Sequence, residues 1–183
     1  LFTLRDDVFF HSNDILFGED SSRKVSASDV VYSFNRLIDA EILSPGKWVM
    51  NKVARNEDGS LRVRAINDTL VAIELVEAFP PFLGILSMQY CSIVPAEAFE
   101  NAEFDFLDHP IGTGPFQFKY WKKNGKLVLL KNPNYFQFNE TGERLPYLDA
   151  LSISFLRDQE VVFLNFLKGE LDLISGLKGS YKD

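Results

Sequence analysis

The first segment with a clear hydrophobic pattern lies between Ser26 and Ile38. Apolar side chains recur there at the spacing of one helical face, at Val30, Phe34, Leu37 and Ile38. Ser26 is a suitable N-cap, and Asp29 stands three residues later, where a capping box places an acid. The pattern therefore predicts an amphipathic helix that begins after Ser26 and ends between residues 39 and 42.

Alternation of apolar and polar residues predicts two β-hairpins. The first joins residues 60–66 to 69–76 through a short turn at Asn67-Asp68. The second joins residues 116–121 to 126–132 through a turn that contains Asn124-Gly125.

Shorter apolar runs predict single strands. Two flank the Asp6-Asp7 pair within residues 1–10, and three others cover residues 91–95, 151–156 and 170–175. The segment between His11 and Ser26 is polar and rich in turn-forming residues, so it is expected to be a surface loop.

Further helices are expected between the strands. A short one follows Pro80-Pro81, and a single helical turn covers residues 96–101. Residues 158–169 predict a compact helix that is capped by Asp158 and ended by Gly169. Hairpins thus alternate with isolated helices, which predicts an α+β fold with mixed sheets, hairpins and peripheral helices.

Composition and charge narrow the classes of partner. The net charge is −7 and the basic residues are scattered, so we expect no nucleic-acid partner. Cys91 is the single cysteine, which excludes an intramolecular disulfide. No stretch approaches the length of apolar sequence that spans a bilayer. The chain opens in strand-like residues without a leading Met, which favours a fragment of a longer protein.

The run Gly112-Thr113-Gly114-Pro115 has the small residues of a phosphate-binding loop but not its context. A P-loop needs a lysine after its second glycine, and a dinucleotide-binding loop needs a third glycine and a helix. Here Pro115 and an alternating strand follow. We therefore expect a structural turn, with glycines for unusual backbone torsions and a proline at the strand's first residue.

The residues that could carry catalysis are few. Cys91 lies in an apolar run and is expected to be buried and structural. His11 and His109 are far apart in sequence and give no metal-ligand spacing, although Asp108 adjoins His109. An aromatic group that could stack on a ligand is more typical of a core or interface: Tyr120, Trp121, Tyr135, Phe136 and Phe138. We expect no enzyme activity, no cofactor and no metal site.

Nine segments, in order, resemble those of the family 5 extracellular solute-binding proteins, the peptide, dipeptide and nickel receptors of bacterial ABC importers. The longest are "FTLRDDVFFH", "SASDVVYSFNRLID", "INDTLVAIEL", "HPIGTGPFQFKYW" and "LPYLDALSISFL". The others are "PPFLGILSM", "SIVP", "LLKNPNYF" and "FLKGELDLI". Each is weak alone, but together they cover nearly the whole chain.

The resemblance implies part of a two-lobed, type II periplasmic binding protein. Residues 1–108 would be the small domain, and residues 109–183 would be part of the large-lobe domain. Gly112 to Gly114 would form the crossover between them. The implied partners are a peptide or other small solute and the transmembrane subunits of an ABC permease. The implied location is the periplasm or the bacterial cell envelope, with any membrane association through a lipid anchor outside this segment.

The positions expected to face the solute cleft stand at the ends of elements: Ser92, Gly112, Thr113, Gly114, Ser175, Gly176 and Leu177. Oligopeptides or dipeptides are the expected solutes, and nickel chelate, haem and oligosaccharide remain alternatives. Two other classes stay open. One is an enzyme that uses Cys91 or His109, and the other is an interaction domain with an aromatic patch around Trp121 and Phe136.

Overall fold

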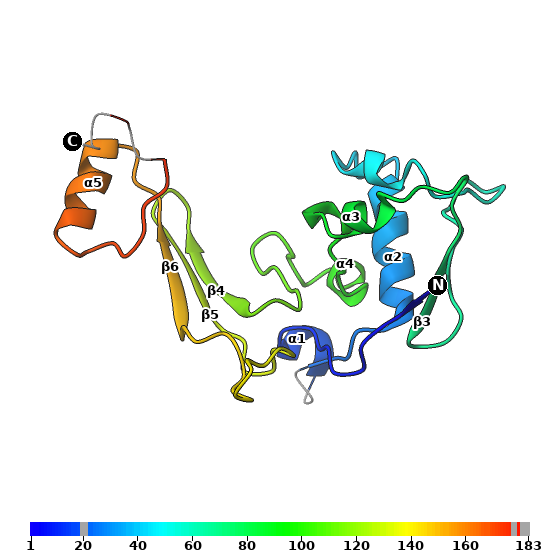
Figure 1. Ribbon diagram of the computed structural model, residues 1–183, viewed down its shortest axis with the longest axis horizontal. Coiled ribbons are helices and arrows are strands. Elements are labelled where there is room, and N and C mark those ends of the chain that lie inside the picture. The colour runs from blue at the N-terminus through cyan, green and yellow to red at the C-terminus, as the bar shows by residue number, and fades with distance from the viewer. Residues whose placement is uncertain (19–21, 177–178, 180–183) are drawn as a thin grey trace.

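The computed structural model describes residues 1–18, 22–176 and 179. Its elements form two groups at opposite ends of an elongated molecule (Figure 1). One end holds the first three strands and most of the helices. The other holds the last three strands and the last helix.

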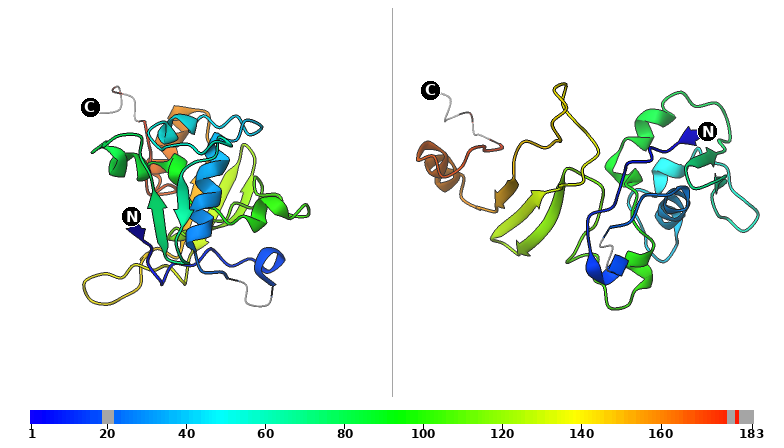
Figure 2. Two further views of the ribbon diagram at one scale, coloured as in Figure 1. Left: turned by 90° about the vertical axis from the view of Figure 1, so that its right-hand side faces the viewer. Right: turned by 90° about the horizontal axis from the view of Figure 1, so that it is seen from below.

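At the first end, helix α2 (Ala27–Ile38) lies across a three-stranded sheet (Figure 2). The strands are β1 (Phe2–Thr3), β2 (Val63–Ala65) and β3 (Leu70–Ile73), in the order β1-β3-β2. The first predicted hairpin is confirmed, with Val63 opposite Ile73. The capping box is also confirmed, because the Asp29 carboxylate accepts a hydrogen bond of 2.8 Å from the Ser26 backbone N–H.

The main core lies between α2 and this sheet. Its buried members are Ala27, Val30, Phe34, Val49, Met50, Val53, Leu61, Val63, Val71, Phe82 and Cys91. A second cluster contains Phe10, Ala98, Phe104 and Ile111. Within the described part of the chain, no apolar side chain after Ile111 reaches this degree of burial. The core therefore ends near the expected boundary between residues 108 and 109, although the division into domains stays a prediction.

Short helices complete the first end. They are α1 (Asp14–Phe17), α3 (Phe82–Leu86), α4 (Glu97–Glu100), and the 3-10 turns η2 (Lys47–Met50) and η3 (Gln89–Cys91). Helix α1 falls where the sequence predicted only a surface loop. Asn13 caps it, since its side-chain oxygen accepts a hydrogen bond of 3.0 Å from the Leu16 N–H. A local Asx cap was enough to form one turn of helix in a polar segment.

At the second end, β4 (Phe116–Lys122), β5 (Lys126–Lys131) and β6 (Ala150–Ser154) form a sheet in that order. The second predicted hairpin is confirmed, and Asn124 takes a positive φ of 61° in its turn. Helix α5 (Gln159–Leu167) follows, and Asp158 caps it as predicted, accepting from the Glu160 N–H at 2.8 Å.

The sheets are antiparallel throughout the described residues, so the predicted α+β class is confirmed but the mixed pairing is wrong. Both hairpins have short turns, which bring neighbouring strands together antiparallel, whereas a parallel pair needs a long crossover. The pairs β1-β3 and β5-β6 are also antiparallel although longer segments separate their strands.

Three predicted strands did not form as expected. Residues 91–95 form no strand. Cys91 is the last residue of η3, and the Val94 backbone N–H donates to the Ser33 hydroxyl at 2.9 Å rather than to another strand. Residues 170–175 form none because they have no ladder partner among the described residues. At the start only β1 is a strand, and Phe9 makes a single bridge with Lys24.

Candidate functional site

The crossover before β4, residues 112–114, is hydrogen-bonded to His11, a residue near the start of the chain. The His11 backbone N–H donates to the Gly112 carbonyl at 2.8 Å. The Gly112 N–H donates to His11 Nδ1 at 3.3 Å, and His11 Nε2 lies 2.9 Å from the Gly114 carbonyl oxygen. Nδ1 must therefore be the acceptor, so Nε2 carries the proton and donates to Gly114.

A second residue, Asn132, also binds the crossover. Asn132, buried just after β5, donates from Nδ2 to the same Gly114 carbonyl at 2.9 Å. Its backbone N–H donates to the Pro115 carbonyl at 2.9 Å. The crossover is thus hydrogen-bonded to segments that lie about a hundred residues before it and less than twenty after it. These contacts support a structural turn rather than a phosphate cradle.

The glycines of the crossover do not serve the purpose expected from the sequence. Neither Gly112 nor Gly114 has a positive φ. A Cβ at Gly112 would meet His11 Cε1 at 3.9 Å, an ordinary contact. The expectation that glycine was needed there for unusual torsions is therefore wrong. Sequence reasoning also missed His11 and Asn132, because their partners are distant in sequence and no local pattern marks them.

Burial lowers the pKa of His11 from its ordinary value of 6.5, and its hydrogen bond to the Gly114 carbonyl only partly opposes this. Protonation would also place a hydrogen on Nδ1, where the Gly112 N–H now donates. The neutral ring is therefore the form that holds the crossover.

Acidification is expected to weaken this contact. The unfolded chain binds a proton near pH 6.5 and the folded chain binds it only at a lower pH. The contribution of His11 to the free energy of unfolding should therefore be fully present above pH 6.5. It should be lost as the pH drops from 6.5 toward the lower pKa of His11 in the folded protein. We expect His11→Gln to remove this dependence, measured by urea unfolding of the whole protein from pH 8 to pH 5.

The matched control is His109→Gln, which changes the other histidine of the chain. The His109 ring lies 6.2 Å from the ring of Phe104 and 6.2 Å from that of Phe118, and within the described structure its side chain makes no hydrogen bond to the crossover carbonyls. In this variant the free energy of unfolding should change with pH as it does in the wild type. If His11→Gln also keeps the wild-type pH dependence, His11 is not the group responsible for it.

Ser92 lies apart from the crossover. It borders a hollow of about 230 Å³ whose lining is Ser33, Arg36, Leu37, Ile42, Ser44, Tyr90, Ser92, Val94 and Phe99. Its hydroxyl donates to the Gln89 carbonyl at 2.7 Å. The Arg36 guanidinium covers the Phe99 ring, 3.6 Å from its centroid. Gly112, Thr113 and Gly114 are not among the residues that line this hollow.

Two further predicted positions, Ser175 and Gly176, are at the other end of the molecule. Ser175 and Gly176 follow α5, and Gly176 has a φ of 76°. Leu177 lies outside the described residues.

At the crossover, Thr113 is half-buried and makes no hydrogen bond within the described structure. The cleft assignments of all seven positions stay predictions.

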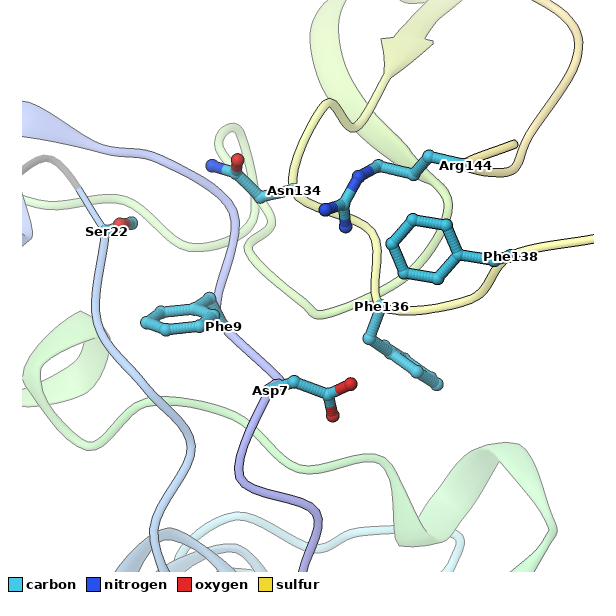
Figure 3. A pocket seen from close by; sticks show the side chains of 7 residues that line it. All are labelled: Asp7, Phe9, Ser22, Asn134, Phe136, Phe138 and Arg144. Carbon is cyan, nitrogen blue, oxygen red and sulfur yellow. The ribbon is translucent and has the colours of Figure 1, made fainter. Parts of the chain in front are cut away.

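A larger hollow of about 430 Å³ was not predicted from the sequence (Figure 3). Its lining is Asp7, Phe9, Ser22, Asn134, Phe136, Phe138 and Arg144. Phe136 and Phe138 belong to the aromatic group noted above, whereas Trp121 of that group contacts Phe155 instead, at 6.4 Å between ring centroids.

The groups considered for catalysis lie in settings that do not activate them. Burial raises the pKa of the Cys91 thiol, and its Sγ lies 3.5 Å from the Ile85 carbonyl oxygen. A raised pKa leaves less of the reactive thiolate at neutral pH. Among the residues described, no cluster of three or more His, Cys, Asp or Glu side chains could hold a metal ion. No helix there is long and apolar enough to cross a membrane.

Comparison with known proteins decides the family. Residues 1–183 match the family described as bacterial extracellular solute-binding proteins, family 5 Middle. The chain belongs to this family. Its resemblance in sequence is thereby confirmed, and family 5 members are binding proteins rather than enzymes.

Individual relatives agree with this family 5 assignment. Di/tripeptide-binding protein 2 of Pseudomonas aeruginosa is 32% identical over 169 residues, which cover 87% of this chain and 30% of that protein. Heme-binding protein A of Haemophilus influenzae is 30% identical over 182 residues, which cover 94% of this chain and 32% of that protein. The family 5 chain thus spans about a third of the length of these relatives.

Solved structures show the same fold. The periplasmic binding protein DppA from Helicobacter pylori, in complex with the peptide STSA, superimposes with a TM-score of 0.73 at 27% identity. The match covers 92% of this chain and 33% of that one. The two sheets and their helices are therefore part of a two-lobed periplasmic binding protein fold.

Proposed function

We propose that this chain is part of the substrate-binding component of a bacterial ABC importer that captures dipeptides or oligopeptides. The observation that carries the proposal is the match to a di/tripeptide-binding protein, 32% identical over 87% of the chain. The protein would work in the periplasm or anchored to the cell envelope. It would deliver its solute to the transmembrane subunits of a permease and would catalyse no reaction.

Capture would occur by closure of two lobes around the solute. His11 from the first end of the molecule and Asn132 from the segment after β5 both bind the Gly114 carbonyl, so residues 1–108 and the β4–β6 sheet would move as one unit. The second half of the cleft would come from the parts of the protein beyond this segment. Backbone hydrogen bonds to an extended peptide would allow varied side chains.

Within this segment, Thr113 is the crossover residue best placed to contact a solute. The carbonyl of Gly112 and the carbonyl of Gly114 are already occupied, by the His11 backbone and by the His11 and Asn132 side chains. Thr113 has no such partner in the described structure. Ser175 and Gly176 would contribute at the end of the molecule that carries α5, and Ser92 from the small domain. Leu177, the remaining proposed position, lies outside the described residues.

Native mass spectrometry of the whole mature protein, purified without added ligand, tests this function. We expect a ladder of adducts at the masses of short peptides, because backbone recognition tolerates many sequences. Protein that has been unfolded in urea, washed and refolded is the control, and it should lose the ladder and regain it when a dipeptide mixture is added.

Other outcomes would separate the alternatives. One discrete adduct with the mass of haem or a nickel chelate would replace the peptide assignment, and haem is the ligand named for one relative. A bare protein that takes up no peptide after addition would contradict solute capture and favour an interaction domain.

A further inference from the structure

The larger hollow lies between two distant segments of the chain. Asp7, Phe9 and Ser22 line one side, and Asn134, Phe136, Phe138 and Arg144 line the other (Figure 3). Its volume of about 430 Å³ is within the range of small-molecule sites. None of its lining residues is among the positions proposed for the solute cleft.

The carboxylate in this hollow is already neutralised. Both oxygens of Asp7 accept hydrogen bonds from Arg5, at 2.9 Å and 2.8 Å. That ion pair lowers the pKa of Asp7, so the group stays charged and paired at neutral pH. The Arg5 guanidinium also lies over the Phe136 ring, 5.0 Å from its centroid. A cationic ligand would therefore find no free acid on this wall.

The other charged group has no such partner. The Arg144 guanidinium lies over the Phe138 ring, 4.5 Å from its centroid, and donates through Nη1 to the Tyr135 carbonyl. It makes no ion pair with any residue in the described parts of the chain. The ring and the carbonyl fix its orientation while leaving further N–H donors available. The lining therefore carries one uncompensated positive charge in a protein of net charge −7.

The geometry points to a ligand with one carboxylate and an apolar tail. A guanidinium presents a planar fork that matches a carboxylate through two parallel hydrogen bonds. Phe9, Phe136 and Phe138 supply aromatic surface for a ring or a short alkyl chain. A phosphate dianion fits less well, because Arg144 is the one uncompensated cation of the lining. We propose that this hollow is a second binding site, separate from the solute cleft, for a small aromatic or aliphatic carboxylate.

An occupied site would tie its two walls together. Asp7, Phe9 and Ser22 belong to the first end of the molecule, and residues 134–144 lie in the connection between β5 and β6. A ligand that contacts Arg144 and Phe9 would add to the contact that His11 and Asn132 already make at the crossover. Binding should therefore raise the melting temperature of the protein.

The test uses 3-phenylpropionate as the probe, with 3-phenylpropanamide as its neutral counterpart. Ligand-observed NMR titration of the whole protein should show the acid binding about tenfold more tightly than the amide, because the amide lacks the charge that pairs with Arg144. Arg144→Gln should remove this preference by weakening the acid about tenfold. The matched control is Arg64→Gln, which changes an exposed arginine of β2 outside the hollow and should leave both affinities unchanged.

The aromatic wall is tested separately by Phe138→Ala, which should weaken the acid and the amide alike. Phe155→Ala, at a similarly exposed phenylalanine outside the hollow, is its control. Equal binding of the acid and the amide, an Arg144→Gln variant that binds like wild type, or no binding at millimolar probe would each overturn the proposal. Solute adducts measured on the same variants report the main function independently, so failure of either proposal is distinguishable from failure of the other.

Discussion

Replacing Asp29 with alanine is expected to lower the free energy of unfolding by about 2–4 kcal/mol, because it removes both a helix cap and hydrogen bonds to a charged group. Asp29 is almost completely buried at the start of α2 and pairs with Arg23 through both oxygens, at 2.7 Å and 2.9 Å. It also accepts from the Ser26 N–H and hydroxyl, both at 2.8 Å. Its removal would leave a partly buried guanidinium and the helix N-cap without their shared partner.

Arg23 links this cap to the rest of the fold, which is why the effect should spread. The guanidinium reaches the Glu97 carboxylate at 2.7 Å and lies over the ring of Phe10, 5.0 Å from its centroid. Hydrogen–deuterium exchange of the whole protein should show faster exchange in α2 and in the segment around Phe10. The control is Asp68→Ala, an exposed acid whose side chain has no partner in the described structure, and its exchange should match wild type. Equal exchange in the two variants would contradict the role of Asp29.

Leu61→Ala is expected to cost about 2–5 kcal/mol of the free energy of unfolding. Leu61 is 2% exposed and packs in the main core with Met50, Val53 and Phe34. Truncation removes apolar contacts and leaves a cavity that the surrounding side chains fill only in part. The Leu61 backbone N–H would keep its bond to the Asn35 side chain at 2.9 Å, so the loss reports packing.

Urea unfolding of the whole protein measures this loss. Hydrogen exchange in residues 61–75 reports the loss locally. Leu107→Ala is the matched control, because the same residue type is 84% exposed there. It should stay within about 0.5 kcal/mol of wild type. A Leu61→Ala variant as stable as Leu107→Ala would show that the core lies elsewhere.

Local signals in the sequence identified most elements. Helix α2 follows from its apolar spacing and from the Ser26 and Asp29 pair, and both hairpins follow from alternation on either side of a turn. These features depend on residues within a few positions of one another. Helix α1 was missed because one Asn13 cap in a polar segment is a weak signal.

Predictions that needed a distant partner were less successful. Residues 91–95 have the composition of a strand. However, the Ser33 hydroxyl hydrogen-bonds to both the N–H and the carbonyl of Val94, where a neighbouring strand would have bonded. Residues 170–175 alternate like a strand without a neighbour in the described chain to pair with. A strand depends on its partner's hydrogen bonds, which no local pattern contains.

The sequence by itself determined the family, the α+β class, the helix caps and the turns, because each is encoded by short-range chemistry or by ordered motifs along the chain. Only the tertiary structure decided how the crossover is held and where ligands could bind. His11 and Gly114 are 103 residues apart in sequence, and Asp7 and Phe9 come to line one hollow with Phe138 and Arg144 only after folding. These hydrogen bonds and this hollow join residues that are distant in sequence. Such residues become neighbours only in the folded chain, so no local pattern in the sequence reports them.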